Sequence, residues 1–360
     1  MSNKQDSLAP NFAVGLNHDV WEFSDLILKN RFMESLNEGG TRYAIYRELR
    51  FAARMDLEAL FDDLALNLNC RVQRLDSRAM ILDADGIFIS AFGGRKKDYS
   101  SGVFNIWGDS LETVESMKQK ILECVGDAKI DDPMFSVDWH FLTSRGDLES
   151  VAIEELADDV LHDEAYPDFE KGVSDFISRY LDADETVLIL QGSPGTGKTR
   201  FIRAILGEIS KRKGEQAFAL YTGDKKTLEN DEIFVKFITG LEDAFVIEDA
   251  DHILKPRAEG NENLHRFLTV ADGIVRAQGR KIIFSTNLPN VKDLDDALIR
   301  PGRCFARVSV RELSLDEAKV LLEELCEKQQ DKIAKAIEVL TRQEKKHYSL
   351  ADIYKIAAQI

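Results

Sequence analysis

Hydrophobic residues recur at helical spacing in the first part of the chain. Residues 19–36 place apolar side chains three and four positions apart, and the glycines that follow provide a helix stop. Residues 41–68 repeat apolar positions in a similar way, at Ile45, Leu49, Ala52, Ala53 and Leu57. This stripe predicts a second amphipathic helix. We therefore expect residues 19–68 to be helical.

From Cys70 the hydrophobic period shortens to that of strands. Short β-branched or aromatic runs are separated by turn sequences at Asp83-Ala84-Asp85-Gly86 and Gly93-Gly94. They predict an antiparallel sheet over residues 70–142, with one helix over residues 111–125. We expect residues 1–146 to form an α+β domain. It contains no catalytic constellation, and we assign it to binding a substrate or partner.

A run rich in carboxylates follows, from residue 147 to residue 168, and it ends at Tyr166-Pro167-Asp168. Its charge and its proline favour a solvated connection. We expect a partly helical acidic linker here.

Strands and helices alternate after this linker. Strands are expected at 186–190, 217–221, 244–247 and 281–286, and helices at 200–213, 231–240 and 263–277. This order predicts an α/β fold with a mostly parallel sheet and helices on both faces. We expect this core to span residues 169–310. Ligands of such sheets bind at the carboxyl ends of the strands.

The first expected strand of this core leads into a complete G-x-x-x-x-G-K-[ST] phosphate loop. Its residues are Gly192, Ser193, Pro194, Gly195, Thr196, Gly197, Lys198 and Thr199, and Arg200 begins the following helix. Glycines let backbone N–H groups close around phosphates, Lys198 can reach the β and γ phosphates, and the Thr199 hydroxyl can bind Mg²⁺. We expect a nucleoside triphosphate to bind here, at the positive end of the helix.

A second expected strand stops on the acidic sequence Glu248-Asp249-Ala250-Asp251. Hydrolysis of a magnesium nucleotide needs one carboxylate for the metal and its waters, and another that orients or deprotonates the attacking water. We expect Glu248 on the metal side and Asp249 as the base. Asp251 is the alternative base if the register shifts.

Two further candidates for the site follow along the chain. Asn287 ends the strand over 281–286, and its neutral amide can hydrogen-bond the attacking water. Arg300 and Arg303 flank a Pro-Gly turn. They are either surface arginines or fingers that act on the γ-phosphate held by a neighbouring subunit.

These motifs, in this order and spacing, resemble the AAA family of the AAA+ ATPases, with its Walker A, Walker B, sensor 1 and arginine-finger elements. The resemblance covers residues 166–360. It implies a P-loop three-layer core, a small helical lid over residues 311–360, ATP with Mg²⁺, and a ring, usually a hexamer, with nucleotide at each subunit boundary. Capping-box sequences at Ser314 and Ser349 agree with lid helices.

The sequence also departs from the family pattern. Its Walker B reads Glu-Asp instead of Asp-Glu, which is similar to the subgroup that contains the mitochondrial translocase of the Rieske protein. Asp249 is one methylene shorter than glutamate, which favours slow hydrolysis. Residues 222–228 lack the aromatic pore loop of many members, so the sequence does not indicate threading by aromatic residues. Residues 255–257 either line a pore or form a solvated loop.

Composition narrows the function further. Asp and Glu number 64 against 47 Lys and Arg, a net charge of −17, which opposes nonspecific binding to nucleic acid or anionic lipid. Neither the four cysteines nor the six histidines have metal-ligand spacing. The start of the chain lacks the apolar stretch of a signal peptide, and no apolar run approaches the ~18 residues of a membrane span. We expect a cytoplasmic protein.

Three functional hypotheses follow. The leading one is a ring-forming ATPase that remodels or moves a protein partner chosen by the N-terminal domain. The second is a slow, nucleotide-gated assembly switch. The third, a nucleic-acid motor or loader, is disfavoured by the net charge of −17.

Overall fold

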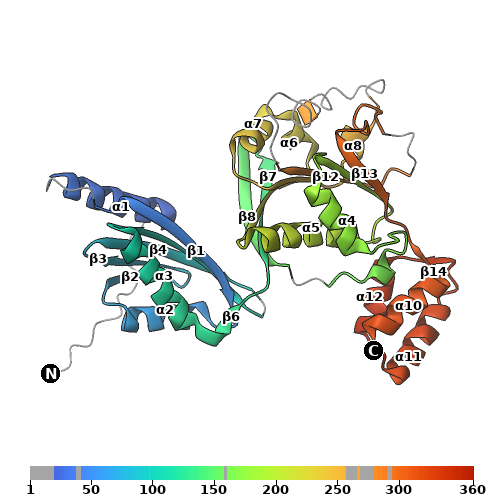
Figure 1. Ribbon diagram of the computed structural model, residues 1–360, viewed down its shortest axis with the longest axis horizontal. Coiled ribbons are helices and arrows are strands. Elements are labelled where there is room, and N and C mark those ends of the chain that lie inside the picture. Colours follow the sequence, from blue (N-terminus) through green and yellow to red (C-terminus); the bar gives the residue numbers. More distant parts are fainter. Residues whose placement is uncertain are drawn as a thin grey trace. The chain divides into compact units, whose positions relative to one another are not determined.

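The computed structural model describes residues 20–37, 42–96, 98–157, 160–256, 266–267, 279–289 and 294–360. The chain divides into two compact units, Met1–Asp131 and Asp132–Ile360 (Figure 1). The boundary therefore lies before residue 146, the limit that the sequence led us to expect. Among the described residues, no helix has both the length and the apolar character needed to cross a membrane.

Antiparallel strands form the sheet of the first unit, in the order β2-β3-β4-β5-β1-β6. The strands are β1 (Ile45–Ala53), β2 (Arg71–Asp76), β3 (Ala79–Ala84), β4 (Ile87–Arg95), β5 (Ser100–Gly108) and β6 (Lys129–Ile130). The helices are α1 (Val20–Asn37), α2 (Leu57–Asn67) and α3 (Leu111–Val125), with the 3-10 turn η1 (Gly126–Ala128) before β6. The helices expected over 19–36 and 111–125 are thus confirmed.

Helices α2 and α3 bury one face of this sheet. Phe61 of α2 packs edge-on against Phe104 of β5, and both are fully buried. Helix α1 contacts the other face, where the Arg31 guanidinium lies 2.6 Å from the Asp83 carboxylate of β3. Successive side chains of a strand point to opposite faces, so Leu82 belongs to the core while Asp83 faces α1.

The second helix expected in this unit, over 41–68, is wrong in its first half. Residues 45–53 form β1, which pairs with β5 and β6, and α2 begins only at Leu57. Ile45, Leu49 and Ala53 are four positions apart, and that spacing returns to the same side of a strand as well as of a helix. Asp56 caps α2 by accepting a hydrogen bond from the Glu58 N–H, which places the helix start after the strand.

The sheet of the second unit has the order β13-β9-β12-β11-β10-β7-β8. Its strands are β7 (Met134–Leu142), β8 (Leu148–Leu156), β9 (Val187–Gln191), β10 (Ala217–Thr222), β11 (Ala244–Ile247), β12 (Lys281–Thr286) and β13 (Cys304–Ser309). Neighbouring strands run parallel except for β8, which is antiparallel to β7. The expected parallel α/β core is confirmed.

Strands β7 and β8 lie where the sequence led us to expect the end of the N-terminal domain and an acidic linker. Instead, β7 pairs with β10, and β8 follows as an edge strand. The carboxylates of β8 do not exclude a strand, because its side chains from Glu149 to Ile153 are exposed to solvent. Charged side chains are common on edge strands, where they oppose further pairing. The linker assignment therefore fails for residues 148–156.

Helices cover both faces of this sheet (Figure 1). On one face lie α4 (Val173–Asp182) and α5 (Lys198–Lys213), which share a core with Leu188, Leu190 and Val246. On the other face lie α6 (Lys225–Glu229), α7 (Asp231–Thr239) and α8 (Asp251–Leu254), packed against Ile189 and Phe245. The helix expected over 263–277 lies outside the described residues, except for helical residues 266–267.

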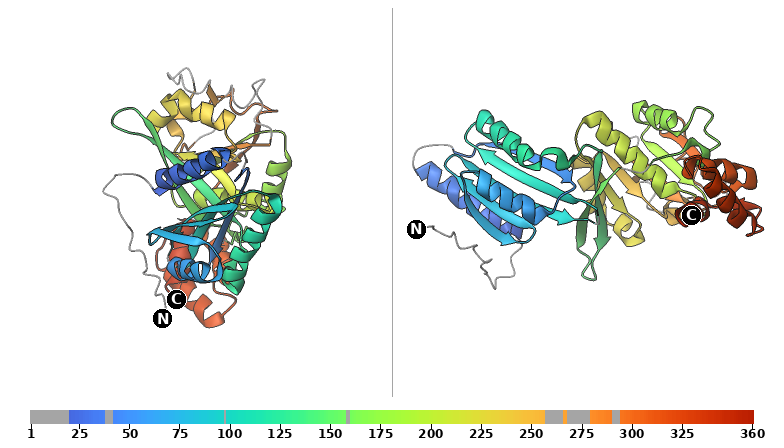
Figure 2. Two further views of the ribbon diagram at one scale, coloured as in Figure 1. Left: turned by 90° about the vertical axis from the view of Figure 1, so that its left-hand side faces the viewer. Right: turned by 90° about the horizontal axis from the view of Figure 1, so that it is seen from below.

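A small helical lid completes the second unit. It consists of α10 (Leu315–Leu325), α11 (Gln330–Thr341) and α12 (Leu350–Ala358), with the short pair β14 (Leu313–Ser314) and β15 (His347–Tyr348). Figure 2 shows these helices, in red, packed together as a bundle. The capping box expected at Ser314 is present, and Ser349 caps α12 by accepting from the Asp352 N–H. These helices lie within residues 311–360, the range over which the sequence predicts a lid.

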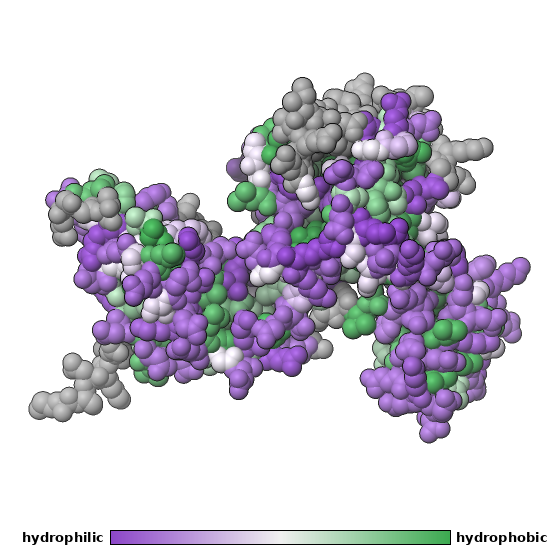
Figure 3. Space-filling view, viewed as in Figure 1, coloured by the Kyte–Doolittle hydropathy of each residue, from purple (hydrophilic) through white to green (hydrophobic). Residues whose placement is uncertain are grey.

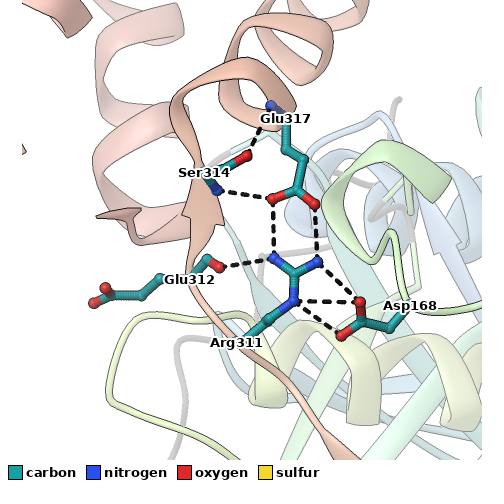
Figure 4. A network of polar contacts seen from close by, with 5 residues as sticks. All are labelled: Asp168, Arg311, Glu312, Ser314 and Glu317. Atoms are coloured by element: carbon teal, nitrogen blue, oxygen red, sulfur yellow. Dashed lines mark hydrogen bonds and ion pairs between the residues drawn. The ribbon is translucent and has the colours of Figure 1, made fainter. Parts of the chain in front are cut away.

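Arg311 joins the lid to the segment before α4 (Figure 4). Its guanidinium donates to the Asp168 carboxylate at 2.9 and 3.0 Å, and to the Glu317 carboxylate at 2.8 and 2.9 Å. Glu317 is also the second half of the capping box that begins α10. Arg311 lowers the pKa of Glu317 to about 2. A single side chain thus holds the first lid helix against the core.

Candidate nucleotide site

The phosphate loop connects β9 to α5, as the sequence predicts. Gly195 and Gly197 have φ angles of +80° and +102°, a region that favours glycine. A Cβ atom on Gly192 would lie 2.0 Å from the Val310 carbonyl oxygen, and one on Gly197 would lie 2.6 Å from Leu350. The Tyr166 hydroxyl also donates to the Gly197 carbonyl at 3.0 Å. The loop is therefore held in a conformation that these glycines alone permit.

Lys198 lies buried at the start of α5, with its amine directed back into the loop. Its Nζ donates to the carbonyls of Gly192 and Ser193 at 2.6 and 3.0 Å, and to Asn287 Oδ1 at 2.9 Å. Burial lowers the pKa of Lys198, whereas the carboxylates of Asp249, Glu248 and Asp251 act in the opposite direction. The amine thus links the phosphate loop to the end of β12.

Glu248 is held at both carboxylate oxygens. The Thr199 hydroxyl donates to Oε1 at 2.6 Å, and the Tyr221 hydroxyl donates to Oε2 at 2.8 Å. Burial, reinforced by the Glu248 carboxylate, raises the pKa of Tyr221, so this phenol keeps its proton. This contact brings Glu248 next to Thr199, the expected Mg²⁺ ligand.

Asp249 faces the site from a left-handed backbone, with φ at +50°. Its Oδ1 accepts a hydrogen bond from Asn287 Nδ2 at 2.9 Å. A non-glycine residue with positive φ is uncommon, although Asp and Asn tolerate it better than most. Such conformations concentrate at functional sites. The structure therefore brings the expected base and the expected water-orienting amide into contact.

Asp251 has a different environment from Asp249. Its Oδ1 accepts from the Thr286 hydroxyl at 2.5 Å and from the Asn287 N–H at 2.9 Å. These bonds fasten the start of α8 to the end of β12. The alternative of Asp251 as the base is therefore disfavoured, because this carboxylate holds the backbone that carries Asn287.

A cavity of about 500 Å³ joins these groups to the lid. Its lining includes the phosphate loop, Glu248, Asp249 and Asn287, together with lid residues of α12. The Ala351 N–H of the lid donates to the Gly195 carbonyl at 3.0 Å. The Arg200 guanidinium lies 4.0 Å from the centre of the Tyr354 ring. The lid is thus one wall of the site.

The structure separates the two expected arginine fingers. Arg300 is exposed, whereas Arg303 is 9% exposed and its guanidinium donates to the Ala297 carbonyl. The Pro-Gly turn after Arg300 carries the backbone back toward the sheet, so Arg303 points inward and supports the turn. Burial and this internal hydrogen bond disfavour Arg303 as a finger, whereas the exposed Arg300 remains a candidate.

The sequence analysis missed three tyrosines of this site, Tyr166, Tyr221 and Tyr354. Tyr221 had a usable signal, because it lies near the carboxyl end of an expected parallel strand, where ligands bind. Tyr166 lies in the expected linker and Tyr354 in the lid, far from the phosphate loop along the chain. Only the folded arrangement brings these two residues to it.

The residues present fit a magnesium nucleotide. The glycine-built loop and the buried Lys198 suit a phosphate chain, and Thr199 with Glu248 offers the oxygen ligands that Mg²⁺ prefers. In the part of the chain that the structure describes, no group of three or more His, Cys, Asp or Glu is placed to hold a metal. Mg²⁺ is usually bound by one or two carboxylates plus substrate phosphates, and Glu248, beside Thr199, offers such a carboxylate.

Part of the chain is similar to known ATPases. Residues 188–312 match the family described as "ATPase family associated with various cellular activities (AAA)". The ATP-dependent zinc metalloprotease YME1 homolog of Caenorhabditis elegans is 32% identical over 133 residues, which are 34% of this chain and 18% of that protein. ATP-dependent zinc metalloprotease FTSH 6, chloroplastic, of Arabidopsis thaliana is 30% identical over 170 residues, 41% of this chain and 24% of that protein.

A third relative is named as an ATPase and not as a metalloprotease. Peroxisomal ATPase PEX6 of Rattus norvegicus is 27% identical over 207 residues, which cover 54% of this chain and 18% of that protein. The chain thus spans less than a quarter of the length of these three relatives.

Proposed function

We propose, from the match of residues 188–312 to the AAA family of ATPases, that this chain hydrolyses ATP in a ring to remodel a protein partner. One arrangement supports the site assignment: Thr199 contacts Glu248, and Asn287 contacts Asp249. The residues proposed to serve the metal are therefore separate from those proposed to act on the attacking water. The resemblance of the motifs to the AAA family supports the ring and the choice of ATP.

In this proposal each residue has a distinct role. Lys198 binds the β and γ phosphates, and Thr199 binds Mg²⁺, whose water ligands Glu248 orients. Bound Mg²⁺ would neutralise charge that develops on the phosphates. Asp249 accepts a proton from the attacking water, and Asn287 aligns that water. Because Asn287 also bonds Asp249 and Lys198 in this structure, nucleotide must exchange some of these bonds for its own.

Arg300 is the proposed finger, contributed to the site of the adjacent subunit. Its exposure supports this role. An arginine finger stabilises charge in the transition state and contributes about 10³–10⁵ in turnover in well-studied cases. We expect Arg300→Ala to reduce turnover at least a hundredfold while ATP binding stays nearly intact. Arg145→Ala, on an exposed turn of the same unit, is the matched control.

The ring is tested by ATPase rate per subunit across protein concentration, with mass photometry on the same samples. We expect the rate to climb as ring-sized particles form. Mixing Arg300→Ala with Asp249→Asn then tests the shared site, because a mixed ring combines an intact base with a neighbour's Arg300. Recovery of activity in the mixture is expected, whereas full turnover by Arg300→Ala alone contradicts a finger acting between subunits.

The partner is proposed to be a protein that the first unit selects. Helix α1 supports this, since it exposes Leu26, Phe32, Met33 and Leu36 by 40–57%, and Figure 3 shows hydrophobic surface over this helix. No histidine of this sequence stands in an H-E-x-x-H motif, so the proposal does not include the protease activity that the relatives' names state. The test is capture of a partner by ATP-bound Asp249→Asn, with the ADP-bound protein as control.

A slow nucleotide-gated switch is the second candidate. It is favoured by the short Asp249 side chain and by its hydrogen bond to Asn287, both of which hinder attack by water. Weak turnover that no captured partner accelerates would favour the switch. Turnover that rises severalfold with a captured partner would favour remodelling.

A further inference from the structure

Tyr221 is the least expected neighbour of the proposed metal site. It lies on β10 and pairs in register with Val246 of β11, two residues before Glu248. Its ring is partly buried and packs against the core that includes α5. Its hydroxyl, however, is directed to Glu248 Oε2 at 2.8 Å.

The Tyr221 hydroxyl and the Thr199 hydroxyl together bind both oxygens of the Glu248 carboxylate. Thr199 from α5 occupies Oε1 and Tyr221 from β10 occupies Oε2, so two elements on different sides fix the plane of the group. A glutamate has one more rotatable bond than an aspartate, and fixing a long side chain costs more conformational entropy. A rigid donor at the second oxygen offsets this cost by restricting the carboxylate before the metal arrives.

We propose that Tyr221 is a positioning residue for Mg²⁺, which orients the Glu248 carboxylate toward Thr199 and the water ligands of the metal. The inference rests on the proposed function, because it assumes that Glu248 serves a magnesium nucleotide. Hydrogen bonds that orient metal-binding groups typically change metal affinity by about 10–100-fold when removed. By orienting the Glu248 carboxylate, Tyr221 offsets the greater conformational freedom of a glutamate at this position.

The first experiment removes the hydroxyl alone. Mn²⁺ binding is measured by EPR on the full chain with the slowly hydrolysed analogue ATPγS, for wild type and Tyr221→Phe. We expect Mn²⁺ affinity to fall about tenfold, while ATPγS affinity in EDTA changes less than twofold. An Mn²⁺ affinity within twofold of wild type overturns the proposal.

Tyr180→Phe is the matched control. Tyr180 is fully buried in α4, and its hydroxyl donates to the carbonyls of Thr186 and Ile282. Loss of this hydroxyl lowers stability without touching the cavity lining, so Mn²⁺ affinity should not change. If both variants lose Mn²⁺ affinity equally, Tyr221 acts only through stability and the proposal is wrong.

A double-mutant cycle tests the connection to glutamate. Aspartate at position 248 is one methylene too short to hold both bonds, so Tyr221→Phe should have less than a twofold effect in a Glu248→Asp background. Equal effects of Tyr221→Phe in both backgrounds would show that the two residues are not coupled, which contradicts the proposal.

The Mn²⁺ titration distinguishes failure of the proposed function from failure of the role proposed for Tyr221. A wild-type chain that binds no Mn²⁺ with ATPγS defeats the proposed function. A wild-type chain that binds Mn²⁺ normally, with Tyr221→Phe unchanged, defeats the role of Tyr221 alone.

Discussion

The two sheets of the molecule place their polar residues differently. In the second unit β9, β10, β11 and β12 run parallel, so their carboxyl ends share one edge. Tyr221, Glu248 and Asn287 meet the phosphate loop there. In the first unit the strands are antiparallel, and successive strand ends lie at opposite edges. Its described polar contacts include the bond from Tyr46 to Asn105 and the contacts of Arg31 with Glu34 and Asp83.

This difference explains why the chemistry gathers in one unit. The parallel sheet brings to one edge residues that are 27 positions apart, as Tyr221 and Glu248 are, and residues that are 89 positions apart, as Lys198 and Asn287 are. An antiparallel sheet with an apolar face provides stability without collecting such groups. Changes at the parallel edge should therefore alter ATP turnover, and changes in the antiparallel core should alter stability. The predictions below run from the largest expected effect on turnover to the smallest.

Lys198→Ala should have the largest effect. It removes the cation for the phosphates and leaves three hydrogen-bond acceptors without their donor. Charged hydrogen bonds contribute about 1.5–3 kcal/mol each, so we expect ATP affinity to fall at least a hundredfold and turnover to vanish. Fluorescent ATP binding measures this, with Lys211→Ala, at the exposed far end of α5, as control. Tight binding by Lys198→Ala would exclude this loop as the phosphate site.

Asp249→Asn should follow, with turnover lowered by about 10²–10⁴-fold, as for loss of a general base. Asn tolerates the positive φ of this position, so folding and ATP binding should persist. Single-turnover kinetics with radiolabelled ATP measure the step. If this variant keeps more than a tenth of wild-type turnover, another group activates the water.

Arg311→Ala should have a smaller effect, because it loosens one wall of the site and leaves the carboxylates and Lys198 in place. We expect turnover to fall severalfold and the unfolding free energy of the second unit to fall by about 1–2 kcal/mol. Thermal melts with and without ATP measure this, and Arg342→Ala, at the C-cap position that ends α11 and paired with Glu338, is the control. Unchanged turnover would mean that ATP hydrolysis does not depend on the contacts by which Arg311 holds the lid.

The Arg311–Glu317 contact also predicts a pH dependence. The pKa of Glu317 is lowered to about 2 when the chain is folded, from 4.5 otherwise. Its stabilising contribution is therefore complete above pH 4.5 and is lost as pH falls toward 2. Both side chains are partly exposed, so solvent screening limits it to about 1 kcal/mol. Wild type and Arg311→Ala should converge in stability below this range. A constant difference down to pH 2 would contradict the ion pair.

Phe61→Ala should have the smallest effect on turnover and a large effect on stability. Phe61 is fully buried in the antiparallel unit, and truncating such a residue costs about 3–5 kcal/mol. We expect the first unit to melt at lower temperature while basal ATPase activity stays within twofold. A large loss of basal activity would show that the two units are energetically coupled.

Much of the second unit could be predicted because its signals are local. A phosphate loop needs glycines at fixed offsets from Lys198. A buried strand that ends on Glu248 and Asp249 can likewise be recognised from a short stretch of sequence. The first unit was harder. Ile45, Leu49 and Ala53 have a spacing that fits helix and strand equally, and only pairing of β1 with β5 decides between them. The strand β8 was hidden for a similar reason, since an exposed edge strand and a solvated linker can have the same composition.

The sequence by itself determined the nucleotide chemistry, because that chemistry depends on residue types at short, fixed separations: the phosphate loop, the acidic strand end and Asn287. The tertiary structure decided which side chains share the site. It turned Arg303 inward to the Ala297 carbonyl, and it brought the lid against the loop. It also directed Tyr221 to Glu248. These choices depend on strand order and on packing between distant segments, and no local spacing in the chain specifies them.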